Sequence, residues 1–290
     1  MTPAEVGAAA QLACLLEVSA PKPGNVSPGR HFHDTRYEDF LVSAVAIGPA
    51  MAAAGETPLG GAVRAAVAAT HRLTPRNTNL GIMLLLGPLC RAARRDDGSP
   101  LRERVRRVLA ETTVADAASV YEAIRLAAPS GLGAARAQDV AASPTVTLRE
   151  AMALAADRDS VAREYVTDFA ITFELGAPAL RAALADGLAW TDAVVEAYLG
   201  ILAAVPDSHV ARKLGLPAAE VISGRAGEVG ALGGVRTGPG RAALAAFDAE
   251  LRDERNTRNP GTSADLTAAA ICVVILEDGW HPSGEHARAE

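Results

Sequence analysis

The chain has 290 residues, of which 49% are hydrophobic but only 4% aromatic, so its core must consist mainly of alanine, leucine and valine. Its formal net charge is −6, which argues against nucleic acid as a partner, because proteins of that class carry a basic surface that matches the phosphates. We expect one all-helical domain over residues 1–290, with an ordered core at about 3–278 and a polar tail at 279–290.

Helical periodicity dominates the chain, and strand-like alternation never lasts. Over Arg36–Ala54, apolar or small residues recur at spacings of three and four, and Asp34 or Thr35 is placed to cap the start. The pattern predicts an all-α fold, a globular bundle of ten or more helices. Further helices are expected at Pro3–Val18, Leu59–Arg72, Leu80–Arg94, Leu101–Ala110, Val114–Ala127, Leu148–Ala156, Ser160–Ala185, Thr191–Ala204, Arg241–Arg252 and Ser263–Glu277.

The predicted helix Leu101–Ala110 has a thin apolar stripe and many charges. Such a helix belongs on the surface, and its charged side chains are expected to face solvent rather than to form a binding patch. These charged residues are Arg102, Glu103, Arg104, Arg106 and Arg107.

Cysteine usage and hydropathy indicate a cytoplasmic protein without a membrane partner. Cys14, Cys90 and Cys272 lie far apart in apolar segments, which is typical of buried reduced thiols. The N-terminus lacks the basic, apolar and small-residue order of a signal peptide. The longest strongly apolar run, Leu266–Leu276, is about half of the ~20 residues that a membrane span needs, so we expect a buried helix there.

Lysine and asparagine are scarce, and their positions are informative. Only two of the 28 basic residues are lysines, and all five asparagines lie in breaks between apolar runs, where turn formation alone is one explanation. Four breaks, at residues 21–34, 76–81, 206–215 and 258–265, each lead into a helix. Because a helix N-terminus presents unpaired N–H groups and partial positive charge, such breaks suit phosphate.

The first break mounts Lys22 between two prolines, which places a flexible cation on a stiff backbone. Gly24 allows a ligand to approach the backbone, and Asn25 can both donate and accept hydrogen bonds. Asp34 is a candidate ligand for hydrated Mg²⁺. The alternatives are a rigid crossover in which Asp34 only caps a helix and, less favoured, a transition-metal pair of neighbouring histidines, His31 and His33.

In the second break, Asn77, Thr78 and Asn79 precede Gly81 and a very apolar helix. Helix capping is one interpretation. Two asparagines two positions apart exceed what one cap needs, so we favour a ligand contact for these residues.

The third break places four functional residue types within seven positions: Asp207, His209, Arg212 and Lys213. A carboxylate suits magnesium, an imidazole suits proton transfer, and the two cations suit a polyphosphate. A surface capping and salt-bridge cluster is the alternative. The presence of the second of only two lysines favours a binding site.

In the fourth break, Asn259, Ser263 and Asp265 open the apolar C-terminal helix, whose ends are expected near the core, where polar groups need a partner or a ligand. Glu174 lies in the otherwise apolar stretch FAITFELGAP. A carboxylate on an apolar helix is either paired or functional, so Glu174 is a further candidate.

Taken in order, these junctions resemble the triphosphoribosyl-dephospho-coenzyme A synthase family. The resemblance runs from about Gln11 to about Glu277. It rests on PKPGNV with Asp34 and FLVSA at 40–44, on Asn77-Thr78 with Gly81, on Asp207-Ser208-His209 with the following basic pair, and on PGTSADL at 260–266. Asn79 and Leu80 depart from the citrate lyase members, which have Asn-Thr-His followed by a basic residue. The citrate lyase members also carry a mid-chain Gly-Ala-Arg-Gly-Glu-Ala segment, which this chain lacks. The chain is therefore similar to the divergent branch found in archaea and in bacteria with pterin-linked one-carbon chemistry.

The resemblance implies an all-α transferase that joins the ribose carbon of ATP to a ribose hydroxyl of dephospho-CoA, or of a related acceptor, and releases adenine. The hypothesis that follows assigns phosphate binding to Lys22, Arg212 and Lys213, and Mg²⁺ to Asp34 and Asp207. Acid–base or charge-stabilising roles fall to Asp207, His209, Asp265 and Glu174. Substrate orientation falls to Gly24, Asn25, Asn77, Thr78, Asn79, Gly81, Asn259 and Ser263.

Two other functions fit the same residues. One is a non-catalytic nucleotide- or coenzyme-binding protein in a carrier or one-carbon cofactor assembly pathway, which needs the phosphate-binding junctions but not the acid–base set. The other is an N-glycosidic hydrolase that transfers the ribosyl group of ATP to water. The sequence is also compatible with a homo-oligomer.

Overall fold

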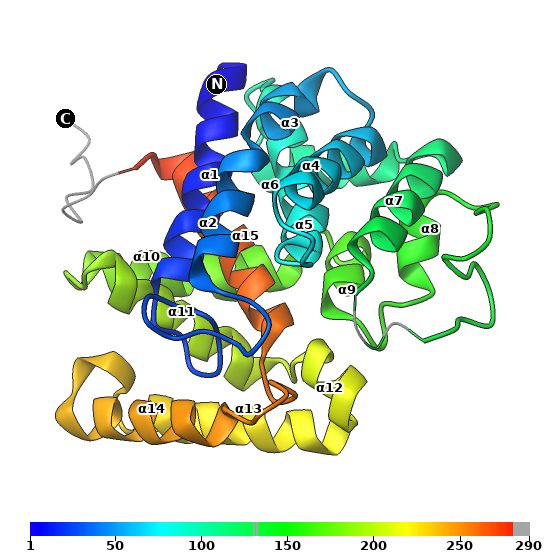
Figure 1. The fold of residues 1–290 in the computed structure, drawn as a ribbon. Coiled ribbons are helices and arrows are strands. Elements are labelled where there is room, and N and C mark those ends of the chain that lie inside the picture. The colour runs from blue at the N-terminus through cyan, green and yellow to red at the C-terminus, as the bar shows by residue number, and fades with distance from the viewer. Residues whose placement is uncertain (130, 132, 281–290) are drawn as a thin grey trace, which may run out of the picture. The chain divides into compact units, whose positions relative to one another are not determined.

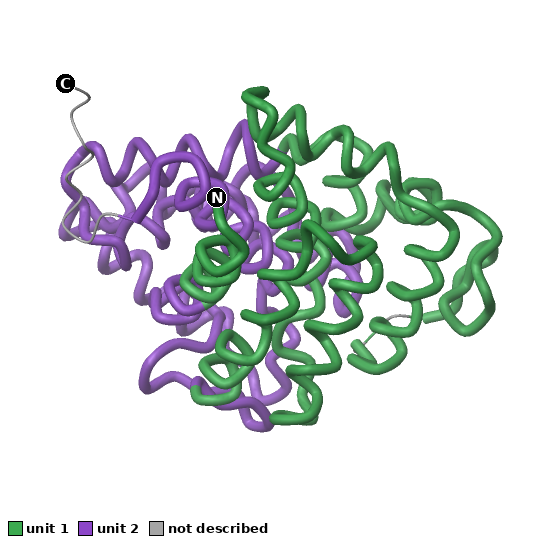
Figure 2. The backbone as a smooth tube through the Cα atoms, turned by 90° about the horizontal axis from the view of Figure 1, so that it is seen from above, with its two compact units in different colours: residues 1–14, 38–170 green, residues 15–37, 171–290 purple. Residues whose placement is uncertain are grey.

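A computed structural model describes residues 1–129, 131 and 133–280 of the chain (Figure 1). Within these residues the regular backbone structure is helical, and β-type pairing is limited to one bridge between Ser27 and Arg30, so the predicted all-α class with ten or more helices is confirmed. The chain forms two compact units (Figure 2): unit 1 comprises residues 1–14 and 38–170, and unit 2 comprises residues 15–37 and 171–290. The single domain stays a prediction, and the predicted tail lies outside the described residues from 281 onward.

In unit 1, α4 packs against α7, which is distant in sequence, and against its neighbour α5, and α5 in turn contacts α6. Most of α1 belongs to this unit, and its last residues belong to unit 2. The elements are α1 (Pro3–Ser19), α2 (Tyr37–Ala46), α3 (Gly48–Ala52), the 3₁₀ turn η1 (Ala53–Gly55), α4 (Leu59–Leu73), α5 (Leu80–Arg94), α6 (Leu101–Ala110), α7 (Val114–Ala127), α8 (Leu148–Ala153) and α9 (Ser160–Val166).

Unit 2 is centred on α11, which packs against α10, α13 and α15. Its α15 is buried from Leu266 to Ile275, as the apolar run predicted. The elements are the π-helix η2 (Ile171–Gly176), α10 (Ala177–Ala185), α11 (Trp190–Ala204), α12 (Ser208–Leu214), α13 (Leu216–Ala231), the 3₁₀ turn η3 (Gly234–Arg236), α14 (Gly238–Leu251) and α15 (Gly261–Asp278).

The single helix predicted over Arg36–Ala54 is wrong, because the structure breaks it into α2, α3 and η1. Pro49 has no N–H to donate to the carbonyl of Val45, and the Gln11 Nε2 donates to that carbonyl instead at 2.9 Å. The first amide of α2, that of Tyr37, donates to the Nδ1 of His31 at 3.1 Å. His31 therefore takes the capping position that the sequence suggested for Asp34 or Thr35.

The helix predicted over Ser160–Ala185 is also wrong, because α9 ends at Val166 and is followed by η2 and α10. Asp168 and Phe169 have φ angles of 53° and 60°, a left-handed conformation that a right-handed helix does not continue through. Phe169 is fully buried beside Tyr165, at a ring-centroid distance of 6.2 Å. Burial of this aromatic side chain stabilises the break.

Two further comparisons with the sequence concern the thiols and membrane-length helices. All three cysteines are free and buried, as predicted. Among the described residues, the stretch Tyr37–Gly55 is long and apolar enough to cross a membrane, judged by length and composition alone. The helices α11 and α12, which are bent by 53° relative to each other, meet the same criterion when taken together. Buried core helices of soluble proteins also meet it. The absence of a membrane partner stays a prediction.

Candidate active site

Three of the four predicted junctions, at residues 21–34, 206–215 and 258–265, lie in unit 2. A hydrogen bond joins the last two directly, and Asn256, just before the last junction, links both His33 of the first and Lys213 of the middle one. The remaining junction, at residues 76–81, lies in unit 1. Unit 2 therefore contains most of the predicted site residues, and its junctions form one connected cluster around the N-termini of α12 and α15.

Lys22 does not present a cation to solvent. Its side chain is fully buried, and the Nζ lies 2.9 Å from the Oε1 of Glu17, which is itself 4% exposed. The same Nζ donates to the backbone carbonyls of Glu17 and Ala20. This burial contradicts the expectation that Lys22 contacts a phosphate, because its donors are directed at the end of α1.

Gly24 makes a close approach, but to the protein rather than to a ligand. Its φ is +74°, and a Cβ at this position would lie 2.9 Å from the Cβ of Leu251 and 3.1 Å from the Cδ of Pro260. The Gly24 amide donates to the Oδ1 of Asp248 at 2.8 Å, and the Arg252 Nε donates to both oxygens of that carboxylate at 3.0 Å. Asp248 therefore ties the first junction to α14.

Asn25 is buried and also has protein partners. Its Nδ2 donates to the hydroxyl of Tyr198 at 3.0 Å, and that hydroxyl donates to the carbonyl of Pro23 at 2.8 Å. Burial raises the pKa of Tyr198 well above its usual value, so the hydroxyl keeps its proton and acts as a donor. The contacts of Asn25 fix the loop rather than orient a sugar or base.

Asp207 is the N-cap of α12, and its side chain also joins this helix to α15 through hydrogen bonds from Ser263. Its Oδ1 accepts from the amides of His209 and Val210 at 2.9 and 3.0 Å, and its Oδ2 accepts from the amide and hydroxyl of Ser263 at 2.7 and 2.8 Å. Burial raises the pKa of Asp207, and these hydrogen bonds oppose the rise. Because both oxygens carry two donors, the predicted metal-binding and catalytic roles of Asp207, and the substrate contact of Ser263, do not fit this geometry.

His209 lies two positions after this cap, and its side chain is held by Arg212. The Arg212 Nη2 donates to the His209 Nδ1 at 3.2 Å, because a guanidinium has no acceptor. Burial, Lys213 and Arg212 lower the pKa of His209 to about 3, so the ring is neutral at pH 7. With its Nδ1 accepting, the proton of the neutral imidazole is on Nε2, which makes His209 a hydrogen-bond donor rather than a strong acid.

Asn259 lies beside the imidazole and has an unused acceptor. A Cβ on Gly261 would be 3.5 Å both from the ring of His209 and from the Nδ2 of Asn259, which places the two side chains over the same turn of backbone. The Oδ1 of Asn259 is buried and has no hydrogen-bond partner among the described residues. An unpartnered buried acceptor is costly, so this atom is well suited to accept from a ligand.

A chain of polar contacts connects Lys213 to the first junction. The Lys213 Nζ donates to the carbonyl of Asn256 at 3.3 Å, the Asn256 amide contacts the Nδ1 of His33 at 3.0 Å, and the His33 Nε2 lies 3.8 Å from the Oδ2 of Asp34. Burial and Arg212 lower the pKa of Lys213, while Asp253, Asp34 and Asp207 oppose the change. Lys213 is only half-buried and thus keeps N–H donors for a ligand.

The carboxylates of this region offer one candidate metal ligand. Asp34 is 45% exposed, and the Thr35 hydroxyl donates to its Oδ1 at 3.1 Å. Within the described part of the chain, no group of three or more His, Cys, Asp and Glu side chains could hold a metal ion. Mg²⁺ commonly binds through one or two carboxylates together with substrate phosphates and water, and Asp34 fits that mode while Asp207 does not.

The predicted residues of unit 1 form a separate hydrogen-bonded group. Asn77 is exposed and its Oδ1 accepts from the amide of Leu80 at 3.2 Å, which is the capping interpretation. Thr78 is buried, with its hydroxyl 2.5 Å from that of Ser43, and the buried Asn79 donates from Nδ2 to Thr70 at 2.9 Å. Gly81 is half-buried in the first turn of α5.

Glu174 and Asp265 differ in burial. Glu174 lies in the π-helix η2 and is exposed, so its role stays a prediction. Asp265 is half-buried on the second turn of α15. Asp265 remains a candidate acid–base residue, because it lies in the same junction as Asn259 and Ser263, which belong to the cluster.

Sequence reasoning missed three residues that organise the cluster: Asp248, Tyr198 and Asn256. Asp248 and Tyr198 lie within helices, and no local pattern distinguishes them. Asn256 could have been found, because it is one of the five asparagines that the chain keeps at its junctions, and its φ of 52° explains why asparagine is suited to that position.

Comparisons with known proteins agree with one another. A family model described as ATP:dephospho-CoA triphosphoribosyl transferase matches residues 3–283. Among solved structures, a candidate triphosphoribosyl-dephospho-CoA synthase from Archaeoglobus fulgidus is similar, with 32% sequence identity, a TM-score of 0.65, and coverage of 83% of this chain and 100% of that chain. No curated protein matches the sequence.

Proposed function

The chain belongs to the ATP:dephospho-CoA triphosphoribosyl transferase family and is a transferase; on this premise we propose that the unit 2 cluster binds ATP and releases adenine from it. In this reaction the bond between the ribose carbon and adenine breaks, and a bond forms between that carbon and a hydroxyl oxygen of dephospho-CoA. The hydroxyl proton leaves with adenine overall. The protein must therefore hold a triphosphate, stabilise the departing base and orient the acceptor.

The observation that carries the proposal is the pair of half-buried side chains of His209 and Asn259. The neutral imidazole offers an Nε2–H donor, and the Asn259 Oδ1 is a buried acceptor without a partner among the described residues. A purine offers ring nitrogens that accept and an exocyclic amine that donates, so this pair matches the edge of adenine. Donation from His209 to a ring nitrogen stabilises negative charge as the base departs.

The phosphates are assigned to Arg212 and Lys213, which follow His209 on the same helix. Arg212 presents a fork of N–H donors that matches phosphate oxygens, and Lys213 supplies a compact cation. These residues lie beyond the imidazole at the end of a short helix. Lys22 is not part of this assignment, because its ammonium group is enclosed with Glu17.

Mg²⁺ is proposed as the partner of the triphosphate, with Asp34 as its protein ligand. The exposed carboxylate of Asp34 contributes to the electrostatic environment of Lys213, which supports a site that contains both a cation-binding and a phosphate-binding group. Bound Mg²⁺ neutralises phosphate charge and fixes the geometry of the triphosphate. Asp34 itself serves to hold the ion, and Lys213 provides the second positive charge.

The test is a quantitative assay of both products by mass spectrometry, with ATP, Mg²⁺ and dephospho-CoA. The wild-type protein is expected to form adenine and the triphosphoribosyl adduct in equal amounts. His209→Gln is expected to lower kcat by about 10²-fold or more, the usual contribution of a positioned proton donor. His71→Gln is the matched control, because His71 is an exposed histidine on α4 of unit 1.

Three results would contradict parts of the proposal. Adenine without adduct would exclude dephospho-CoA as the acceptor, and equal kcat values for His209→Gln and His71→Gln would exclude the imidazole. For the phosphate assignment, Arg212→Gln is expected to raise KM for ATP at least tenfold relative to Arg225→Gln. Arg225 is a half-exposed arginine on α13 that pairs with Glu228. A KM that is unchanged in both variants would exclude Arg212.

A further inference from the structure

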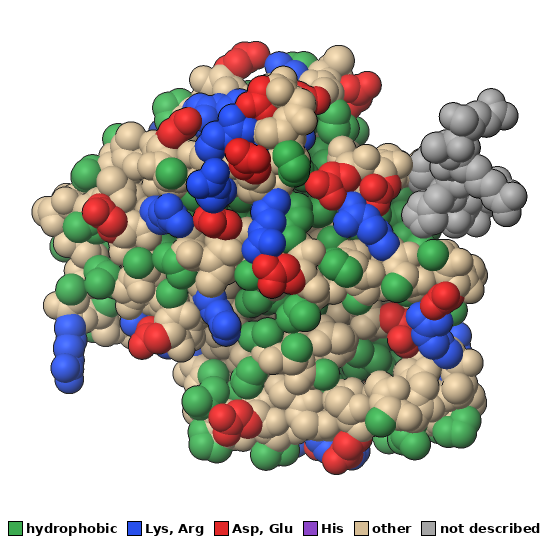
Figure 3. All heavy atoms as spheres, turned by 180° about the vertical axis from the view of Figure 1, so that it is seen from behind, with side chains coloured by type: hydrophobic (Ala, Val, Ile, Leu, Met, Phe, Trp, Pro, Cys, Tyr) green, Lys and Arg blue, Asp and Glu red, His purple; other side chains and the backbone are tan. Residues whose placement is uncertain are grey.

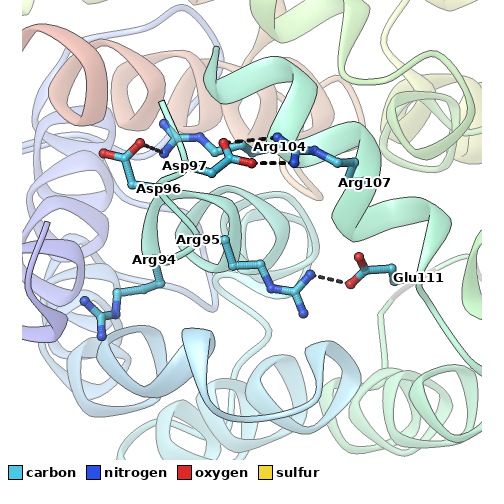
Figure 4. Close-up of a pocket in the computed structure, with 7 residues that line it drawn as sticks. All are labelled: Arg94, Arg95, Asp96, Asp97, Arg104, Arg107 and Glu111. Carbon is cyan, nitrogen blue, oxygen red and sulfur yellow. Dashed lines mark hydrogen bonds and ion pairs between the residues drawn. The ribbon is translucent and has the colours of Figure 1, made fainter. Parts of the chain in front are cut away.

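Part of the α6 surface is more enclosed than its sequence suggested. Arg104 keeps only 13% of its side chain exposed, so the expectation that all charges of this helix face solvent is wrong. It lines a pocket of about 420 Å³ in unit 1, together with residues from the end of α5 and the loop that follows (Figure 4). The lining residues are Arg94, Arg95, Asp96, Asp97, Arg104, Arg107 and Glu111.

Each of the three acids in this pocket is matched by one arginine. Asp96 lies 2.5 Å from Arg104 and Asp97 2.5 Å from Arg107, while Glu111 pairs with Arg95, as the dashed lines in Figure 4 show.

Arg94 is the fourth basic residue of the lining. The Arg94 Nη2 lies 3.9 Å from the Oε1 of Glu56, a residue outside the lining whose side chain is 79% exposed. This ion pair is therefore weak. Four guanidinium groups against three carboxylates leave the pocket lining with one excess positive charge.

Three arginines of the lining each have a side-chain donor without an acceptor among the described residues. The Nε atoms of Arg94, Arg104 and Arg107 are buried and have no hydrogen-bond partner within the described part of the chain. A guanidinium has five N–H donors and no acceptor, so an arginine that is held by a carboxylate through its terminal nitrogens still has an Nε–H to satisfy. All three arginines line the same pocket, and a ligand with several acceptor oxygens matches guanidinium groups gathered in this way.

We propose that this pocket binds a small phosphate-bearing anion, with a diphosphate group as the best match. Its volume lies in the range of small-molecule sites, and a diphosphate carries enough oxygens for donors from three arginines. Arg95 and Arg107 keep 37% and 42% of their side chains exposed, so both can turn toward an entering anion. None of the lining residues belongs to the His209 cluster, so the pocket is an additional anion site.

The distribution of charge agrees with a discrete site. On the face shown in Figure 3, arginine and carboxylate side chains are interspersed rather than gathered into a patch of one sign. Such a surface does not attract a polyanion over a broad area, whereas a pocket with one excess charge and unpaired donors selects a small anion.

The experiment is isothermal titration calorimetry of the full chain with inorganic pyrophosphate at low ionic strength. Arg104→Gln and Arg107→Gln are each expected to weaken pyrophosphate binding at least tenfold. Arg106→Gln is the matched control, because Arg106 lies on the same helix with 57% of its side chain exposed and does not line the pocket. This control is expected to bind pyrophosphate as the wild-type protein does.

Two comparisons decide the origin of the signal. If Arg212→Gln in unit 2 abolishes pyrophosphate binding while Arg104→Gln and Arg107→Gln retain it, the anion binds at the ATP site and the proposal is overturned. The proposal would also be overturned if Arg104→Gln, Arg107→Gln and the control Arg106→Gln bound pyrophosphate with equal affinity. If Arg104→Gln does not fold, Arg107→Gln still tests the proposal, because Arg107 is half-exposed. Circular dichroism of both variants shows whether they are folded. Parallel titrations with inorganic phosphate and ATP distinguish a free phosphate from a nucleotide as the source of the anion.

Discussion

Replacing Asp207 by asparagine separates a structural role from a catalytic one. In the wild-type protein one carboxylate accepts two amides of α12 and two donors of Ser263. An asparagine has one oxygen and one NH₂ group, so one of these two pairs of donors would face another donor. The variant thus loses two buried hydrogen bonds to a charged group.

The magnitude follows from these contacts. A hydrogen bond to a charged group contributes about 1.5–3 kcal/mol, so two of them give about 3–6 kcal/mol. Burial raises the pKa of Asp207, which means that removing the charge recovers part of a desolvation cost, and we expect about 3 kcal/mol. At about 2.1 cal/mol/K per residue, the unfolding entropy of 290 residues is about 0.6 kcal/mol/K, and the expected decrease in Tm is about 5 °C.

Differential scanning fluorimetry of Asp207→Asn measures this shift. Asp186→Asn is the control for the same chemical change, because Asp186 is 58% exposed and pairs with Arg236 on the surface, where such pairs contribute 0–1 kcal/mol. Its Tm should stay within about 2 °C of the wild-type value. An Asp207→Asn protein that melts like the wild type but forms no adenine would refute the structural assignment and restore Asp207 as a catalytic residue.

Three further outcomes are expected. Lys22→Met should lower the free energy of unfolding by about 3–5 kcal/mol, since it leaves the buried Glu17 unpaired, and Lys22→Met/Glu17→Leu should recover most of this loss in urea titrations. Gly24→Ala should destabilise by about 2 kcal/mol more than Gly29→Ala, because both have a φ of +74° but only Gly24 has neighbours within 4 Å. The pKa of His209 is about 3 in the folded state and about 6.5 in the unfolded state, so its contribution to the free energy of unfolding is full above pH 6.5 and decreases as the pH falls. At pH 5.5 the wild-type protein should have lost about 1.4 kcal/mol of stability through this group. His209→Gln should not show this loss.

Each of these has a contrary result that is easy to recognise. Unchanged stability of Lys22→Met with a raised KM for ATP would mean that the ammonium binds phosphate after all. Equal stabilities of Gly24→Ala and Gly29→Ala would show that the contact with Leu251 is not tight. Wild-type protein and His209→Gln that lose the same stability between pH 7.5 and 5.5 would show that this histidine is not the group responsible.

The sequence predicts most helices well where one apolar face is continuous. The bounds of α5, α6 and α7 match the prediction in full. By contrast, α13 was missed, because Gly224, Gly227 and Gly230 weaken its helical pattern. This helix forms because Ala219, Ile222, Ala226 and Val229 lie on one buried face against α11, a tertiary contribution that local propensity does not contain.

The candidate site shows a different limit. The junction residues were identified by their chemistry, and three junctions do meet in unit 2. Their roles could not be assigned from the sequence, because the role of Asp207 depends on Ser263, 56 residues further along the chain. In the same way, Lys22 looks like a ligand-binding cation until its burial with Glu17 is known.

The discontinuous make-up of the two units has a consequence for biosynthesis. Unit 2 takes residues 15–37 from the start of the chain and the rest from residue 171 onward. The amide of Gly24 meets Asp248 only after another 224 residues have been made, which at about 5–20 residues per second takes roughly 10–45 s on the ribosome. During that interval the loop at 21–34 has none of its α14 partners, so this part of the emerging chain is exposed to proteases and chaperones until α14 has been made.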